Sequence, residues 1–545
     1  MNIKKQNGVY YTPSALADFI INYLIKEYSF NNTLSVLEPS CGDGVFVESI
    51  RKSSLYTKHN LSMSLVEIDK SELSKIPDIL NESLDKHEIN YYHDDFLDFQ
   101  KDHFKKYDFI IGNPPYIKKN FLSSNQIEIC NEILQDMGIF PAKIKNIWTA
   151  FLVRSIKMVK EDGIVCFVLP AELLQVKHAE PIRELMSIFF QCIEIFTFNE
   201  IIFENIEQDT IIFIGSKKSN KRGLHYHNIN SLDDIVDNNF TTIINNEFEN
   251  GTDKWTSLML DKKLNLLINN LRDRVQTINS YCKSSAGIVT AANEDFIIGE
   301  HILNKYKLNE YAVPIVKKSS YIQNSIKFTS DDLQELIRKG TPTNLIAFEN
   351  DEDEFSSEVK EYLMLLKEKK IHERYKCKNR HKWFVIPSIW KSEAFFFKRS
   401  YHYPKVIINE ADVCVTDTAY RITMKENFET KSFTFSFYNS LTLVFTELFG
   451  RFYGGGVLEL TPNEFKKLPL PYVEVEEEEI NHLDFMFRTK VELNEILEYT
   501  NFIILEKGFG FTKDEIKSLD KARELLMTRR LKIMTPHSQE SQGAQ

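Results

Sequence analysis

Short apolar runs alternate with helix-like stretches through the first 215 or so residues. The apolar runs have the length of buried strands and occupy residues 34–37, 61–68, 107–112, 163–169, 193–198 and 210–215. Residues 14–26 and 148–160 place apolar side chains at helical spacing, and Pro13 before the first of them suits an opening helical turn. This alternation predicts an α/β domain with a mostly parallel sheet. Ligands of such sheets bind beyond the carboxyl ends of the strands.

The alternation loosens after about residue 219. Residues 230–250 are rich in Asn, Asp and Thr, and the later chain mixes short strands, short helices and turns. Residues 474–479 form an acidic run typical of a solvated face, and residues 480–505 predict one helix. We therefore expect four parts: an α/β domain at 1–245, a mixed α+β domain at 246–475, a helical segment at 476–535 and a disordered polar tail at 536–545.

Composition and charge narrow the function classes. The 545 residues carry a net charge of -11, which argues against a protein coated with basic charge, although a local basic face is enough for nucleic acid. The seven cysteines form no CxxC pair and the histidines no HExxH motif, so we expect no metal and no disulfide framework. Without a signal-peptide core or a long apolar run, the chain is expected to be soluble and cytoplasmic, with no membrane partner.

Asn113-Pro114-Pro115-Tyr116 directly follows the apolar run 107–112. An isolated Asn-Pro-Pro is most often only a turn. At a strand end it also suits methylation of an aromatic amine, whose delocalised lone pair makes it a poor nucleophile. The Asn113 side-chain oxygen and the Pro114 carbonyl can each accept one amine N–H, and the prolines hold that carbonyl rigidly. Tyr116 can stack on the base, so these four residues are the catalytic candidates.

A second motif, Glu38-Pro39-Ser40-Cys41-Gly42-Asp43-Gly44, follows the apolar run 34–37 and opens a helix. It lacks the GxxxxGK[ST] pattern of a phosphate loop, and its acidic residues suit a cation such as the sulfonium of S-adenosylmethionine. Glu67 ends the next strand and could bind ribose, while Asp95 and Phe96 could bind and stack on adenine. Singly, each acidic residue is more often a helix cap or a surface charge; in this order, at strand ends, they favour a site.

Together these motifs resemble the TaqI-like (gamma-class) N6-adenine DNA methyltransferases, and residues 8–13 resemble the family's N-terminal motif for the methionine end of the cofactor. The resemblance covers residues 8–216 well, and it implies an S-adenosylmethionine-dependent methyltransferase domain followed by a DNA target-recognition domain. It also implies that Tyr116 and Phe203 stack on a flipped-out adenine of double-stranded DNA. The implied cofactor residues are Tyr11, Thr12, Pro13, Glu38, Pro39, Ser40, Cys41, Gly42, Glu67, Ile68, Asp95, Phe96 and Asn113. Cys41, with no base motif beside it, is expected to be structural.

The second half resembles the recognition domains of the same family more loosely, at residues 283–290, 451–456 and 468–471. Between these segments, residues 367–405 carry twelve Lys and Arg against three Glu, and Tyr375, Trp383, Trp390 and Tyr401 are interleaved with them. A solvated face over a core would explain this pattern, but a basic patch in an acidic chain favours DNA contact. The candidate DNA-binding residues are Lys378, Arg380, Lys382, Trp383, Lys398 and Arg399.

Several alternatives stay open at this point. Methyltransferases that act on a protein glutamine amide or on an RNA guanine amine also carry NPPY motifs, but they resemble only the first half of this chain. A non-catalytic DNA-binding relative is a further possibility, although the motifs are intact. No convincing nuclease motif supports a fused restriction enzyme. A separate cognate restriction endonuclease is a possible partner, and a solitary methyltransferase is equally compatible with the sequence.

Overall fold

The computed structural model describes residues 11–80, 86–100, 105–198, 209–237, 239–245, 254–322, 324–349, 351–453 and 456–532. The chain forms two compact units. The first unit comprises residues 1–265, 453–456 and 529–541, and the second comprises residues 266–452, 457–528 and 542–545. The first unit continues past the expected boundary at residue 245 because Trp255 and Met259 are buried and Asn265 bonds the carbonyls of Ser257 and Leu260.

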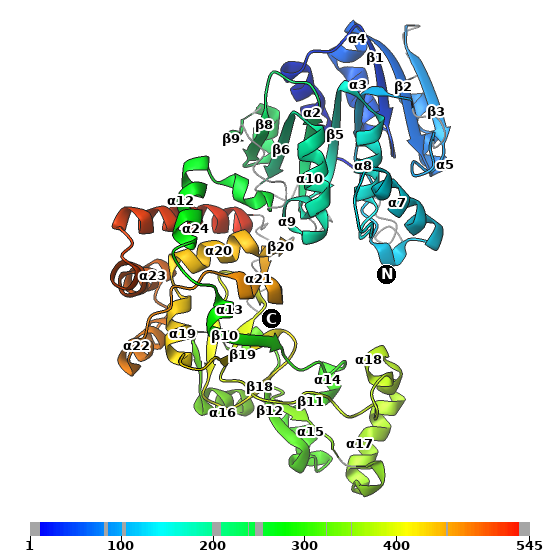
Figure 1. The fold of residues 1–545 in the computed structure, drawn as a ribbon. Coiled ribbons are helices and arrows are strands. Elements are labelled where there is room, and N and C mark those ends of the chain that lie inside the picture. Colours follow the sequence, from blue (N-terminus) through cyan, green and yellow to red (C-terminus); the bar gives the residue numbers. More distant parts are fainter. Residues whose placement is uncertain are drawn as a thin grey trace. The chain divides into compact units, whose positions relative to one another are not determined.

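A nine-stranded sheet with the order β3-β2-β1-β4-β5-β7-β6-β8-β9 forms the first unit (Figure 1). The strands are β1 (Thr33–Glu38), β2 (Asn60–Glu67), β3 (Glu88–His93), β4 (Tyr107–Gly112), β5 (Val159–Pro170), β6 (Cys192–Phe198), β7 (Thr210–Ser216), β8 (Gly223–Ile229) and β9 (Thr241–Asn245). Pairing is parallel from β3 through β5 and between β6 and β8, and β7 runs antiparallel to both its neighbours. The mostly parallel sheet and its six predicted strands are thus confirmed.

Helices cover the central part of this sheet, where the strands are apolar on both sides. Helices α2 (Ser14–Glu27) and α3 (Val45–Lys52) pack on one face, against alternate residues of β1, β2, β4 and β5. Helices α8 (Trp148–Met158) and α10 (Glu180–Phe189) also lie alongside the sheet (Figure 1). Every residue of β6 and β7 is buried, as expected for strands covered on both faces. This arrangement leaves the carboxyl ends of β1, β2 and β4 next to one another.

The second unit is a mixed α+β structure. Its sheets have the orders β10-β19-β15-β17-β13, β11-β14-β12-β18 and β16-β21-β20. Their strands are β10 (Cys282–Ala286), β11 (Ile297–Ile298), β12 (Ala312–Val316), β13 (Lys327–Phe328), β14 (Asn344–Ile346), β15 (Ala394–Phe397), β16 (Arg399–Ser400), β17 (Val406–Asn409), β18 (Cys414–Val415), β19 (Ala419–Met424), β20 (Arg451–Tyr453) and β21 (Val457–Glu459). Its helices include α17 (Ser357–Glu368), α18 (Tyr375–Lys378), α19 (Thr430–Phe437) and α20 (Ser440–Phe449).

The single helix expected at residues 480–505 is wrong. The chain forms α22 (Glu477–Arg488), then α23 (Leu493–Asn501), which continues as a π-helix (Phe502–Gly508) before α24 (Lys513–Lys532). The break lies at Lys490, whose φ of 60° is left-handed and ends α22.

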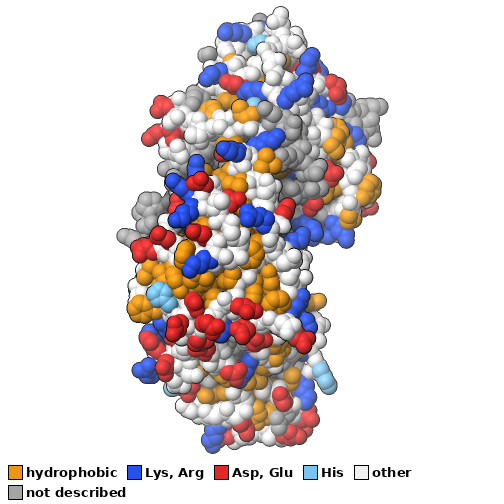
Figure 2. Space-filling view, turned by 60° about the vertical axis from the view of Figure 1, so that its left-hand side comes forward, with side chains coloured by type: hydrophobic (Ala, Val, Ile, Leu, Met, Phe, Trp, Pro, Cys, Tyr) orange, Lys and Arg blue, Asp and Glu red, His pale blue; other side chains and the backbone are white. Residues whose placement is uncertain are grey.

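The acidic run at residues 474–479 has a local explanation, since Glu476 caps α22 together with Glu479 and acidic side chains favour a helix N-terminus. Acidic side chains gather in the lower half of the face in Figure 2. The predicted tail at 536–545 lies outside the described residues.

Candidate active site

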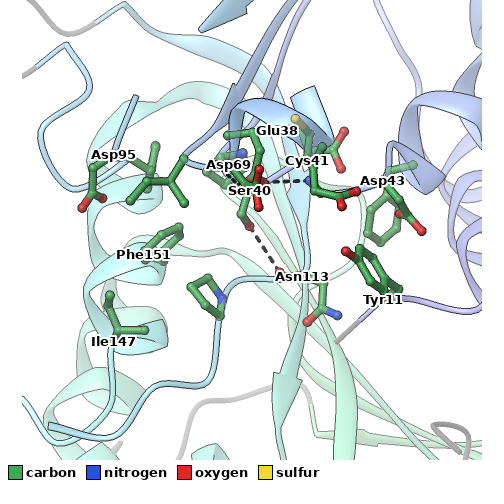
Figure 3. Close-up of a pocket in the computed structure, with 18 of the residues that line it drawn as sticks. Tyr11, Glu38, Ser40, Cys41, Asp43, Asp69, Asp95, Asn113, Ile147 and Phe151 are labelled. Atoms are coloured by element: carbon green, nitrogen blue, oxygen red, sulfur yellow. Dashed lines mark hydrogen bonds between the residues drawn. The ribbon is translucent and has the colours of Figure 1, made fainter. Parts of the chain in front are cut away.

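A cavity of about 330 Å³ lies at the carboxyl ends of β1, β2 and β4. Its walls comprise Tyr11, Thr12, Glu38, Pro39, Ser40, Cys41, Gly42, Asp43, Val45, Phe46, Glu67, Ile68, Asp69, Glu72, Asp94, Asp95, Phe96, Asn113, Pro115, Ile117, Gln126, Ile147 and Phe151. Tyr11 and Asn113 lie on one side of it, and Asp95, Ile147 and Phe151 on the other (Figure 3). Most residues expected from the two sequence motifs therefore meet in one space.

The cavity is strongly acidic, with seven Asp and Glu and no Lys or Arg among its lining residues. Glu38 is 1% exposed, and its Oε2 has no hydrogen-bond partner among the described residues. Burial, together with nearby Asp43 and Glu67, holds the pKa of Glu38 well above its usual range. Burial also raises the pKa of Asp43 and of Asp95. Uncompensated buried carboxyl groups of this kind suit a cationic ligand.

Glu67 connects the two loops that follow β1 and β2. Its Oε2 accepts a hydrogen bond from the backbone N–H of Gly42 at 2.9 Å, and its Oε1 accepts one from that of Asp69 at 2.9 Å. Gly42 has a φ of 50°, a left-handed conformation in which a residue with a Cβ would be strained. Cys41 is buried, and its thiol pKa is raised mainly by burial, as expected of a structural cysteine.

The side of the cavity opposite Asn113 is apolar. Phe96, Ile147 and Phe151 are each no more than 4% exposed, and the Phe96 and Phe151 ring centroids lie 5.0 Å apart. Asp95 beside them accepts a hydrogen bond from the Leu97 N–H at 2.9 Å. Ile147 and Gln126 also line the cavity and were not among the predicted site residues. The sequence does place Gln126 at a helix start, because Ser123 and Gln126 form a capping box before α7 (Ser124–Asp136).

Asn113 stands at the end of β4, where it is held from two sides. Its Nδ2 donates to Thr12 Oγ1 at 3.2 Å, and its backbone carbonyl accepts a hydrogen bond from Ser40 Oγ at 3.2 Å. Pro115 lines the cavity, whereas Pro13, Pro114 and Tyr116 are not among the lining residues. The hydroxyl of the buried Tyr116 donates to the Val168 carbonyl of β5 at 3.1 Å. Phe203, the second stacking candidate, lies outside the described residues.

Most of the predicted DNA-binding residues have partners within the second unit. Arg380 donates to the carbonyls of Val289 and Thr290 at 3.0 and 2.9 Å, and Trp383 packs against a hydrophobic cluster. Lys382 forms an ion pair with Asp351, and Arg399 one with Glu459. Lys378 is exposed at the end of α18 and Lys398 is half-buried. The basic stretch is therefore partly neutralised by acidic residues that are distant in the sequence.

Three features concern metal binding, membrane crossing and cysteine chemistry. Within the described ranges, no group of His, Cys, Asp and Glu is arranged to hold a metal ion. Of the helices described, none is both long and apolar enough to cross a membrane. All seven cysteines are buried and free.

Known proteins resemble both halves of the chain. Residues 45–203 match the family model for the Eco57I restriction-modification methylase, and residues 252–505 match that for the C-terminal domain of type II methyltransferase M.Eco57I. Type II methyltransferase M.AccI of Acinetobacter calcoaceticus is 23% identical over 487 residues, which is 85% of each chain. M.HincII of Haemophilus influenzae is 25% identical over 284 residues, so the match spans only 49% of that protein.

A solved structure extends this likeness to the fold. The type IIL restriction-modification enzyme MmeI, determined in complex with DNA, superposes with a TM-score of 0.62 at 13% identity, covering 97% of this chain and 80% of that one. The gamma class expected from the motif order stays a prediction. The two matched family models and the two relatives support a methyltransferase of the restriction–modification type.

Proposed function

We propose that this chain is a site-specific DNA methyltransferase of the gamma class, which transfers a methyl group from S-adenosylmethionine to the N6 amine of adenine in duplex DNA. One observation carries the proposal: Asn113 and Pro115 stand on the wall of a cavity whose described lining residues include seven acidic ones and no basic one. A group that can accept hydrogen bonds from an amine thus adjoins a space suited to a cation.

The cavity residues fit S-adenosylmethionine, which supplies an activated methyl group on a positively charged sulfonium. Glu38, buried and without a partner for Oε2, suits the cationic methionine end. Phe96, Ile147 and Phe151 offer an apolar slot for the adenine ring, with the Asp95 carboxylate beside it for the ring's amine. Glu67 already accepts two backbone N–H bonds, and its carboxylate keeps acceptor capacity for ribose hydroxyls.

The arrangement of Asn113 suits the activation of a target amine. Because its Nδ2 donates to Thr12, its Oδ1 points to the opposite side of the amide. Oδ1 and the Pro114 carbonyl would accept the two N–H bonds of the adenine amine, which draws the nitrogen toward tetrahedral geometry and frees its lone pair. Catalysis is then mostly positioning and electrostatics, with no covalent intermediate.

Tyr116 would stack on the target base. Its hydroxyl is fixed on the Val168 carbonyl, so the ring would not have to be ordered on binding. A base in a duplex reaches such a site only by flipping out, at a cost of about a few kcal/mol. Phe203 on the other side of the base remains part of the proposal.

Duplex DNA is the proposed substrate because both halves of the chain match restriction–modification methylases. In this proposal the second unit reads base edges and contacts phosphates, which makes the affinity dependent on salt. A separate cognate endonuclease would be the functional partner.

The test is methyl transfer by the purified full chain. Labelled S-adenosylmethionine and DNA from a host without its own methylation are incubated with the protein, and the nucleosides are identified by mass spectrometry. We expect N6-methyladenine as the product. Asn113→Ala should transfer the methyl group about 100-fold more slowly while its affinity for the cofactor stays unchanged. N4-methylcytosine would correct the target base, whereas methyl uptake only into protein or RNA would overturn the proposed substrate.

A further inference from the structure

Trp390 lies in the basic stretch of residues 367–405 but is not one of the candidate DNA-binding residues named there. Trp390 is 39% exposed, although tryptophan is a residue that folding normally buries. The Arg421 guanidinium lies 3.9 Å from the centroid of its ring, which is a cation–π contact. Arg421 itself is 6% exposed, so a largely buried cation supports an exposed aromatic ring.

The loop that carries Trp390 is fixed on both sides of it. Arg421 donates to the Ser388 carbonyl at 2.8 Å, and Ile389 packs against a hydrophobic cluster. Ser388 has a φ of 61°, a left-handed conformation that is costly for serine and persists only where the surroundings impose it. Lys391 after it pairs with Asp412 at 2.5 Å. The ring is therefore held in place before any ligand arrives, which reduces the entropy lost on binding.

The neighbouring edge strand supplies cationic and small polar groups. Strand β10 ends its five-stranded sheet, and its Ser285 stands opposite Arg421 of β19. Lys283, two residues earlier, lies on the same face of the sheet as Ser285 and Arg421. Lys283, Ser285 and Ala286 are exposed. A fixed aromatic ring on the face that bears an exposed lysine and serine suits a nucleic acid, since the ring can stack and the polar groups can meet phosphates.

We propose that Trp390, supported by Arg421, packs against a nucleotide of bound duplex DNA while Lys283 contacts a phosphate. This surface, defined by Lys283, Ser285 and Trp390, is named the Trp390 platform. The inference rests on the proposed function, because it assigns part of the DNA contact to the platform. Trp390 lies within the basic stretch of residues 367–405, but the platform differs from the candidate residues named there, most of which have partners within the chain.

Binding of a mixed-sequence synthetic duplex to the full-length protein tests the proposal. Trp390→Ala is expected to raise the Kd by about 5- to 20-fold, and Trp390→Phe, which keeps a ring, by about 2-fold or less. Lys283→Ala should lower the slope of log K against log salt concentration by about 1. Phe485→Ala is the matched control, since Phe485 is 61% exposed on α22 near the acidic run and should leave the Kd unchanged.

Fluorescence gives a second readout. Of the four tryptophans, Trp148 and Trp255 are buried and Trp383 is half-buried, so a Trp383→Phe background leaves Trp390 as the one exposed tryptophan. The emission of Trp148 and Trp255 is subtracted with the matched Trp383→Phe/Trp390→Ala protein. Duplex should quench the emission of Trp390. A Trp390→Ala protein with parental thermal stability and parental duplex affinity overturns the inference. If that variant matches a parent that binds and methylates DNA, only the platform fails; if the parent binds no duplex, the proposed function fails with it.

Discussion

Glu38 is a buried carboxylate with acidic neighbours. Asp43 and Glu67 lie near it in the cavity, and none of the described residues that line this space is Lys or Arg. Because its folded-state pKa is raised, the ionised form costs stability at neutral pH, as groups held ready for a ligand often do. The same side chain is then stabilised when a cation binds.

Glu38→Gln separates these two effects. The neutral isostere removes a buried charge, so the apo protein should unfold at the same or a higher temperature at pH 7. The affinity for S-adenosylmethionine should fall by about 10- to 150-fold, the range for a hydrogen bond to a charged group. Thermal unfolding and titration calorimetry measure the two effects. A lower Tm with unchanged cofactor affinity would mean that Glu38 is only structural.

Residues of the site were predictable where the chain itself brings them together. Glu38 is the last residue of β1 and Asn113 directly follows β4. Because parallel strands end at one edge of the sheet, the two sequence motifs were enough to predict that these residues meet. The internal role of Arg380 could not be predicted from the local sequence, because the two carbonyls that accept its hydrogen bonds lie about 90 positions earlier in the chain. The local charge therefore indicated a free cation where the structure has a hydrogen-bonded one.

Helix α2 is anchored to the sheet through one buried glutamate, Glu194 of β6. Its carboxylate accepts hydrogen bonds from the hydroxyls of Tyr23 and Tyr28, each at 2.5 Å, and lies 3.0 Å from both Lys221 Nζ and His227 Nε2. These donors lower the pKa of Glu194 to about 2 despite the cost of burial. Thr12, which bonds Asn113, directly precedes Pro13 at the start of the same helix, so the anchor supports the site from a distance.

The first unit should therefore lose stability in acid. Since the folded-state pKa of Glu194 is depressed, its contribution is present above about pH 4.5 and is lost as the pH falls toward 2. We expect a loss on the order of 3 kcal/mol over that window, absent in Glu194→Gln. Denaturant unfolding at a series of pH values measures it. Glu48→Gln is the control, because Glu48 only pairs with Lys52 on the surface. The same acid dependence in Glu194→Gln would refute the anchor.

Elements were predictable where their residues are plainly apolar and not where polar residues are buried. Strands β1, β2 and β4 read directly from the sequence, but β8 contains His225 and His227 and was missed. Both histidines are buried in β8, and His227 is satisfied by Glu194 of the adjacent strand β6. A strand of this kind becomes recognisable only when its partner strand is known.

At the scale of the whole molecule, the C-terminal end of α24 belongs to the first unit. Arg529 of α24 belongs to the first unit, where its guanidinium lies 4.8 Å from the centroid of the Tyr226 ring and attracts Asp209 at the start of β7. Burial raises the pKa of Asp209 to about 6, and Arg529 limits that rise. Residues 320 positions apart thus complete one unit. No local pattern indicates this arrangement, whereas the α/β alternation predicted the unit's sheet.

Arg529→Met should destabilise the first unit by about 3–5 kcal/mol at pH 8, because it leaves the Asp209 carboxylate buried without its partner. The loss should be smaller at pH 5, below the Asp209 pKa, where the carboxyl group is largely protonated and uncharged. Combining Arg529→Met with Asp209→Asn should restore most of the stability. A double-mutant cycle in denaturant measures the coupling, and additive single effects would show that the two residues act independently.

The central claim is that the cavity beside Asn113 methylates adenine in DNA. Single-molecule sequencing of DNA from a host without its own adenine methylation, expressing either this chain or its Asn113→Ala variant, tests it most directly. The account predicts N6-methyladenine in one short sequence context with the parent chain and none with the variant. Unmodified DNA from the parent, although the purified protein binds S-adenosylmethionine, would contradict it.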